Sequence, residues 1–153
     1  FIIDLRNIDI DFNDRTRDLI QTLKKESKEI RERVSSPCEY PRVSFLGTSS
    51  AVPSKYRNVS GYLLEASPTS AVLVDVGEGT YGQMRVLLGE RGCSELLCHL
   101  RAVFVTHAHQ DHMNGLYTII DRRKHAMELS GKDYTPLVLV CNRNVLKPLK
   151  TYS

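Results

Sequence analysis

Three histidines and one aspartate lie within six residues, as His107, His109, Asp111 and His112, with the spacing H-x-H-x-D-H. Neutral imidazole and carboxylate groups are ligands that zinc accepts at about 2 Å. One short loop cannot wrap all four around a single tetrahedral ion without strain, so the spacing favours two adjacent metal ions. His107 and His109 would bind one ion. Asp111 and His112 would bind its neighbour, with a hydroxide between the ions as the nucleophile of a hydrolysis.

The motif directly follows residues 102–105, Ala-Val-Phe-Val, which form the strongest candidate for a buried strand in the chain. The end of a buried strand presents its side chains to a cleft, which favours metal ligation over the alternative of surface histidines on a loop. A helix is expected over residues 112–129, and Gly131 stands where it could end that helix.

The residues upstream predict the elements that position this loop. Residues 62–64 and 71–75 predict a hairpin around the turn-forming residues 67–70. Thr80 could cap a short helix that Gly89 closes. Residues 42–46 predict a strand with Val43 and Phe45 on one side. The apolar face of the expected helix consists of Tyr81, Met84, Leu87 and Leu88.

A charged arm precedes the compact domain. Asn13 could cap a helix in this arm, and the prolines at 37 and 41 would end it. We expect residues 1–41 to form a helical arm or linker and residues 42–153 to form the domain. The apolar positions that share one face of the expected helix are Leu19, Leu23, Ile30 and Val34.

Composition indicates a globular domain. The 153 residues are 41% hydrophobic and 25% charged, with a net charge of +3. Residues 1–36 hold eight Lys or Arg and eight Asp or Glu, so the excess of positive charge lies after them, which suits a phosphate-bearing substrate without requiring one. No apolar run approaches the roughly 18 residues of a membrane span. The four cysteines, Cys38, Cys93, Cys98 and Cys141, form no CxxC pair and are expected to be inert thiols in a reducing compartment.

Several polar residues outside the motif have both a functional and a plain interpretation. Lys55, Arg57 and Asn58 place two cations and an amide in one short stretch, which suits phosphate oxygens and base edges, or is simply a solvated loop. Asp75 ends a buried strand, where it could also be a turn former. His99 and His125 stand apart from other ligands and are expected to be structural or solvated.

The H-x-H-x-D-H motif after an apolar strand resembles the signature of the metallo-β-lactamase superfamily. Three further stretches, residues 45–53, 54–60 and 74–80, resemble the opening motifs of the tRNase Z family, in the same order and at similar distances. Residues 81–83 and 115–139 are more similar to the long form of that family than to the short form. The resemblance covers about residues 42–149.

This resemblance implies an α/β fold, the αββα sandwich of the superfamily, of which only the first αβ half is present. It implies two Zn²⁺ ions per complete domain and an endoribonuclease that removes the 3′ trailer from precursor tRNA. Asp111 would orient the nucleophile and accept its proton, and Asp75 would orient a metal-bound histidine. Lys55, Arg57 and Asn58 would contact the RNA, and the nucleus or mitochondrion would be the location.

The family completes its metal site with a further histidine, a bridging aspartate and a final histidine, all downstream of the motif. Residues 113–153 hold no suitable counterpart, since His125 stands alone. Each metal would keep two protein ligands, so the chain by itself is expected to be inactive and to need the remainder of its polypeptide as a partner. Two alternatives stay open: another hydrolase of the superfamily, or a half-domain that is only a binding module.

Overall fold

The computed structural model describes residues 40–149 and, in the arm, residues 17–18, 21–22, 25–26 and 28–29. These residues of the arm are helical and exposed. The expected cap Asn13 and the four expected apolar positions of that helix lie outside the described residues. The division of the chain at residue 41 therefore stays a prediction.

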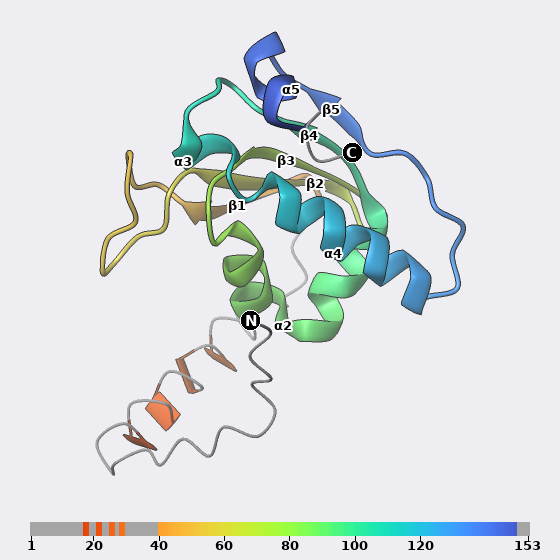
Figure 1. The fold of residues 1–153 in the computed structure, drawn as a ribbon. Helices are drawn as coiled ribbons and strands as arrows, with labels where there is room; N and C mark the ends of the chain where they lie inside the picture. Colours follow the sequence, from red (N-terminus) through yellow and green to blue (C-terminus); the bar gives the residue numbers. More distant parts are fainter. Residues whose placement is uncertain (1–16, 19–20, 23–24, 27, 30–39, 150–153) are drawn as a thin grey trace, which may run out of the picture.

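One five-stranded mixed sheet forms the centre of the domain (Figure 1). Its strands follow the chain in order: β1 (Arg42–Gly47), β2 (Gly61–Ser67), β3 (Ser70–Val76), β4 (Leu100–Phe104) and β5 (Val138–Val140). The first three strands are antiparallel, which confirms the predicted hairpin, and β3, β4 and β5 are parallel. Parallel neighbours need crossover connections, and helices supply them.

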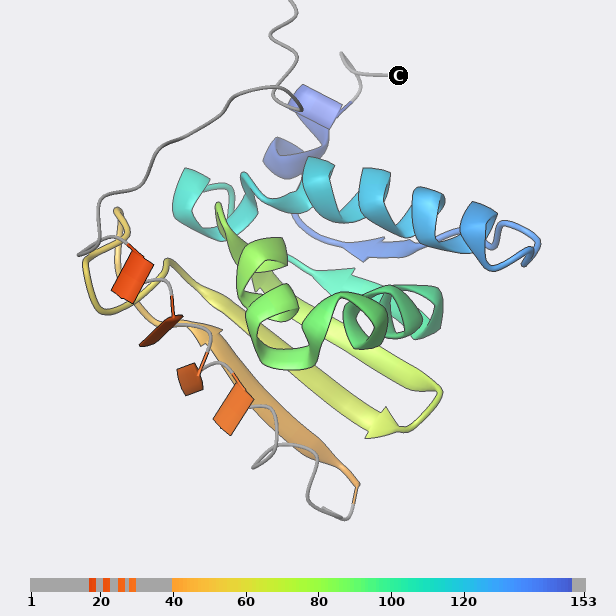
Figure 2. The ribbon, with the colours of Figure 1, turned by 90° about the horizontal axis from the view of Figure 1, so that it is seen from below.

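Of the described helices, α2 (Thr80–His99) and α4 (Leu116–Leu129) cover one face of the sheet (Figures 1 and 2). Two shorter helices, α3 (Gln110–Met113) and α5 (Arg143–Leu149), lie at the end of the sheet where β4 and β5 stop. The core between the helices and the sheet includes Leu63, Leu73, Met84, Leu97, Val103, Ile119 and Val145, all fully or almost fully buried. Among the described residues, no helix is long and apolar enough to cross a membrane. Cys93, Cys98 and Cys141 are free thiols.

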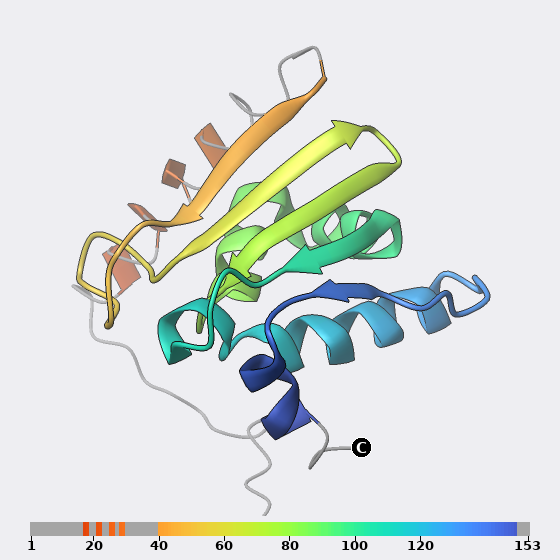
Figure 3. The same ribbon diagram turned by 90° about the horizontal axis from the view of Figure 1, so that it is seen from above.

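The opposite face of the sheet is apolar, and none of the described residues covers it (Figure 3). Phe45 is 71% exposed and Val138 57% exposed, although side chains of this kind are normally buried. Strand register aligns apolar residues across all five strands in two rows, Val43-Leu64-Val72-Ala102-Val138 and Phe45-Tyr62-Val74-Phe104-Val140. A sheet with two apolar faces needs a layer on each, so this face is suited to cover by a second layer.

The structure corrects the prediction for the first helix. Thr80 is not its cap: Gly79 holds that position with φ of 79°, and the Thr80 hydroxyl donates to the carbonyl of Gly77 at 2.7 Å. Gly89 interrupts the helical geometry with φ of 73°, as a closing glycine would. A second helical segment then continues to His99, because it buries apolar residues that include Cys93 and Leu97 in the core.

The single helix expected over residues 112–129 is also wrong, since two helices, α3 and α4, occupy that stretch. They separate at Gly115, whose N–H donates to the carbonyl of Val76 at 2.9 Å. A Cβ at Gly115 would lie 2.3 Å from the carbonyl oxygen of Gly77, so only glycine fits. The predicted end of the second helix is confirmed, because Gly131 follows Leu129 and Ser130 with φ of 65°.

Candidate metal centre

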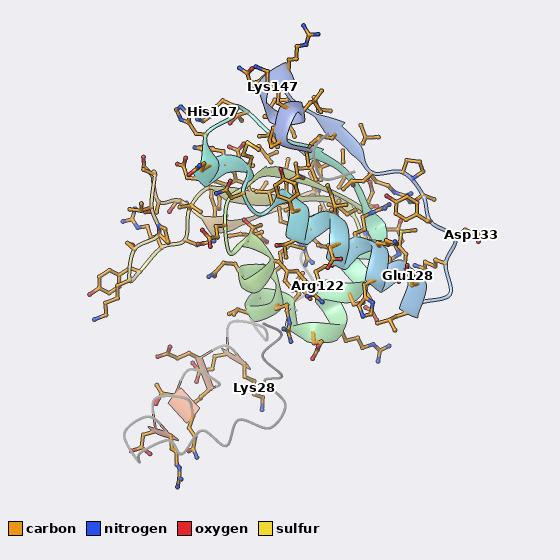
Figure 4. The ribbon with its side chains drawn as sticks, in the orientation of Figure 1. Lys28, His107, Arg122, Glu128, Asp133 and Lys147 are labelled. Atoms are coloured by element: carbon orange, nitrogen blue, oxygen red, sulfur yellow. The ribbon has the colours of Figure 1, made fainter. Side chains whose placement is uncertain are left out.

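The histidine motif lies where β3 and β4 end. Parallel strands bring their carboxyl ends to the same edge of a sheet, so Asp75 from β3 meets the loop that follows β4. Figure 4 shows His107 on this loop, at the end of the sheet. The sequence predicted that the motif follows a strand. The sheet also brings residues of the neighbouring strand β3, such as Asp75, next to the motif.

The four predicted ligands lie together as two pairs of donor atoms. Nε2 of His107 is 3.0 Å from Nδ1 of His109. Nε2 of His112 is 3.4 Å from Oδ2 of Asp111, and the ring centroids of His107 and His112 are 4.1 Å apart. Two ligands on one tetrahedral zinc ion, each at about 2 Å, are separated by about 3.3 Å. Each pair therefore fits one zinc ion in both donor chemistry and separation.

No group of three or more His, Cys, Asp or Glu side chains within the described residues is arranged to hold a metal ion. A catalytic zinc site normally takes three protein ligands and a structural site four. The described residues thus offer two ligands toward each ion. A complete site would take its remaining ligands from elsewhere.

Asp75 lies inside β3, where the register with β2 shifts by one residue. It has φ of 55° and is 3% exposed. Such a bulge turns a side chain away from its strand direction and is common beside active sites. The Asp75 carboxylate accepts from the N–H and the hydroxyl of Thr106, and its Oδ2 lies 2.7 Å from Nδ1 of His112. The predicted orienting aspartate thus contacts one of the predicted ligands.

Thr106 is a residue of the site that the sequence interpretation did not single out. Its hydroxyl oxygen lies 2.9 Å from Oδ1 of Asp75 and 3.0 Å from Nδ1 of His107. In the sequence, only its position directly before His107 pointed to a role for Thr106 in the site. A hydroxyl next to a ligand is too common in sequence to be assigned a role without the contact.

Asp111 is anchored to the loop between β1 and β2. Its Oδ2 accepts a hydrogen bond from the N–H of Ala51 at 2.8 Å, across 60 residues of sequence. This N–H lowers the pKa of the Asp111 carboxyl below its ordinary value, by more than partial burial raises it. Ala51 has φ of 61°, so among the described non-glycine residues both positive φ values, at Ala51 and Asp75, belong to partners of the motif.

Gly77 holds the motif against the end of β3. A Cβ at this position would lie 2.3 Å from the carbonyl oxygen of Asp111 and 2.4 Å from Cγ2 of Val59. Atoms at these separations overlap, so the two backbones can approach this closely only with glycine here. Close packing therefore explains Gly77, the first of the two glycines in residues 74–80.

The predicted RNA-binding residues lie on the loop between β1 and β2, and all three line one shallow pocket. Lys55 and Arg57 are exposed and line a shallow pocket of about 200 Å³ together with Gln83 of α2. The side-chain amide of Asn58 lies against Gly79, with its nitrogen buried and without a hydrogen-bond partner among the described residues. Asn58 lines the same pocket but is half-buried, whereas the two cations are exposed.

Tyr56, between these cations, is a second residue that the sequence interpretation left without a role. Its side chain is 84% exposed, and Nζ of Lys55 lies 5.5 Å from its ring centroid. An exposed aromatic ring flanked by cations suits an unpaired base and its phosphate.

The two histidines outside the motif lie elsewhere. His99 ends α2, and its Nε2 is 3.3 Å from Nζ of Lys132. Burial, followed by this neighbouring charge, lowers the pKa of His99. His125 lies on α4 and lines a groove between α2 and α4 together with Tyr81 and Arg122.

Comparison with known structures identifies the class of the fold. The long-form RNase Z from yeast matches with a TM-score of 0.65 and 24% identity, over 72% of this chain and 15% of that one. The metallo-β-lactamase fold protein YhfI from Bacillus subtilis matches with a TM-score of 0.55 and 19% identity, over 75% of this chain and 42% of that one. The chain therefore has part of a metallo-β-lactamase fold, which confirms the predicted fold class.

Sequence comparison identifies the family. Residues 41–152 match the family model described as Anti-Pycsar protein Apyc1, and the chain belongs to this family. It is 63% identical to the zinc phosphodiesterase ELAC protein 2 homolog of Caenorhabditis elegans over 94% of this chain, and 35% identical to the mitochondrial ribonuclease Z of Drosophila melanogaster over 88%. The chain spans 17% of the length of each of these relatives. The resemblance to long-form tRNase Z is thereby confirmed.

Proposed function

We propose that the protein is a zinc-dependent endoribonuclease that removes the 3′ trailer from precursor tRNA. In this proposal residues 42–153 form the first half of the catalytic domain, and residues 1–41 form a helical arm. One observation carries this proposal: at the ends of β3 and β4, the donor atoms form two pairs. Nε2 of His107 lies 3.0 Å from Nδ1 of His109, and Nε2 of His112 lies 3.4 Å from Oδ2 of Asp111. The choice of substrate rests on the similarity to a zinc phosphodiesterase and a ribonuclease Z.

The residues have separate roles in this mechanism. His107 and His109 would hold one ion, and Asp111 and His112 would hold the second. Bound zinc would supply Lewis-acid chemistry, activating water and neutralising charge on the phosphate. Asp111 would orient the attacking water and take its proton, since its carboxyl is ionised at neutral pH.

The loop between β1 and β2 would bind the RNA. Lys55 and Arg57 are exposed cations next to a pocket, and the same loop contacts Asp111 through Ala51. RNA held by these cations would therefore lie beside the metal ligands. Phosphate contacts of this kind position a substrate without reading its sequence. Asn58, which lines the same pocket, would contact the RNA together with these cations.

The remainder of the polypeptide would complete the site. The uncovered apolar face of the sheet needs a second layer, and each metal needs further ligands. A second αβ half packed on this face would supply both. Location in the nucleus or the mitochondrion belongs to the same proposal, with support for the mitochondrion from the name of the Drosophila relative.

The test uses the full-length protein, prepared with zinc and after removal of zinc by a chelator. The zinc-loaded protein should bind two ions by elemental analysis and cut a labelled precursor tRNA at the 3′ end of the mature sequence. Zinc uptake with cleavage of another ester, but not of precursor tRNA, would favour a different hydrolase of the same fold. Loss of both properties in the intact protein would favour a binding module.

A further inference from the structure

The hydroxyl of Thr106 connects a buried carboxylate to a histidine of the motif. Its Oγ1 lies 2.9 and 3.0 Å from the two carboxylate oxygens of Asp75 and 3.0 Å from Nδ1 of His107. The backbone N–H of Thr106 also donates to Asp75, at 2.9 Å. The threonine is thus held at two points, and the direction of its hydroxyl is constrained.

The chemistry of these groups assigns the direction of each hydrogen bond. A hydroxyl has one proton to donate and lone pairs with which to accept, whereas a carboxylate only accepts. The Thr106 proton therefore goes to Asp75, and the Thr106 oxygen accepts from Nδ1–H of His107. A neutral imidazole carries one proton, so Nε2 of His107 keeps its lone pair.

The same carboxylate acts on a second ring. Oδ2 of Asp75 lies 2.7 Å from Nδ1 of His112, which donates to it directly. One buried carboxylate thereby directs the Nε2 lone pairs of two imidazoles, that of His112 by contact and that of His107 through the threonine. These Nε2 atoms are the ones that face His109 and Asp111 in the two donor pairs.

We infer that Thr106 is a positioning residue for the metal centre: its hydroxyl fixes the orientation and tautomer of His107, so that Nε2 is the atom offered to the metal. This inference rests on the proposed zinc chemistry and adds a residue to it. Groups that hold a metal ligand in this way typically change metal affinity by 10- to 100-fold when removed.

The test compares Thr106→Val with Thr106→Ser in the full-length protein. Thr106 is exposed, so valine keeps its shape and leaves no cavity, while serine keeps the hydroxyl. Thr118→Val, at an exposed position of α4, is a control for the same chemical change away from the site. Zinc affinity is measured by competition with a chromophoric chelator, and unfolding temperature is measured in parallel.

Thr106→Val should weaken the binding of one of the two zinc ions by about tenfold or more, and Thr106→Ser should restore wild-type affinity. The unfolding temperature of Thr106→Val should fall, because its bond to the buried Asp75 is lost, but the protein should still unfold cooperatively. Wild-type affinity in Thr106→Val, or equal weakening in both variants, would overturn the inference, as would a wild-type protein that takes up no zinc. Cleavage of precursor tRNA is followed separately. A wild type that binds zinc without cutting RNA would refute the proposed function and leave the affinity comparison decisive for Thr106.

Discussion

Replacement of Asp111 by alanine tests the proposed chemistry most directly. The side chain has two structural connections, since its Oδ2 accepts the N–H of Ala51 at 2.8 Å and lies 3.4 Å from Nε2 of His112. Asp111→Ala removes a predicted metal ligand and the anchor of the neighbouring loop together. The matching substitution Asp111→Asn keeps an oxygen that can accept from Ala51 but removes the negative charge.

The expected loss can be divided between these connections. A hydrogen bond to a charged group contributes about 1.5 to 3 kcal/mol, all of which Asp111→Ala loses. Asp111→Asn keeps a neutral hydrogen bond of about 0.5 to 1.5 kcal/mol in its place. Loss of a group that acts on the transition state commonly costs about 3 kcal/mol or more, roughly a hundredfold in rate. Both variants should therefore lose at least about a hundredfold in cleavage, while RNA affinity changes by less than about tenfold, or 1.4 kcal/mol.

The assay combines cleavage of labelled precursor tRNA, a binding titration with the same RNA, and elemental analysis of zinc. Asp133→Ala, at an exposed position after α4, controls for the loss of a carboxylate elsewhere (Figure 4). Near-normal cleavage by Asp111→Ala with full zinc content would refute the proposed role. Recovery of activity in Asp111→Asn alone would show that Asp111 serves as the anchor of Ala51.

Three further outcomes are expected. Lys55→Ala and Arg57→Ala should each weaken the binding of precursor tRNA, because both residues are exposed cations beside a pocket. Added salt should also weaken RNA binding by the wild type. A gel-shift titration with Lys124→Ala as the control checks this, and unchanged affinity in both variants would leave the loop without a role in binding. Gly77→Ala should lower the free energy of unfolding by about 1 to 3 kcal/mol, because the added Cβ would lie 2.3 Å from the carbonyl oxygen of Asp111. Chemical denaturation measures this free energy, and a wild-type value in the variant would contradict the close packing. Burial raises the pKa of Cys93 from 9.0 to about 11, so between these values the folded state keeps a thiol proton that the unfolded state loses. The free energy of unfolding should therefore fall between about pH 9 and 11, by up to about 3 kcal/mol. Urea unfolding across this range tests it, and the same pH dependence in Cys93→Ala would exclude Cys93 as the cause.

The strands and the donor set could be predicted because their signals are local. Alternation and apolar runs mark β1 to β4, and the turn residues between β2 and β3 mark the hairpin that the structure confirms. The helices were predicted less well. Gly89 has the backbone conformation of a helix end, but whether a second helical segment follows depends on the core that Cys93 and Leu97 can fill. The break at Gly115 depends on the close approach of Gly77.

The roles assigned to the site residues stay predictions, but the geometry distributes them in a way that sequence could not. Lys55, Arg57 and Asn58 are neighbours in the chain, yet the amide of Asn58 turns toward Gly79 while the cations face solvent. Thr106 lies beside the motif, yet the contact that suggests its role is with Asp75, on a different strand. In both cases the deciding partner is distant in sequence.

The sequence alone determined the set of donors, their spacing and the strand that carries them, because covalent spacing and the two-residue period of a strand are local properties of the chain. Tertiary structure decided the rest. It joined the N–H of Ala51 to Asp111 across 60 residues and turned the carboxylate of Asp75 at a bulge toward His112. Within the part of the chain that the structure describes, it left one face of the sheet uncovered. Alternation tells which residues share a face of a strand, but only the packing of helices decides which face is covered.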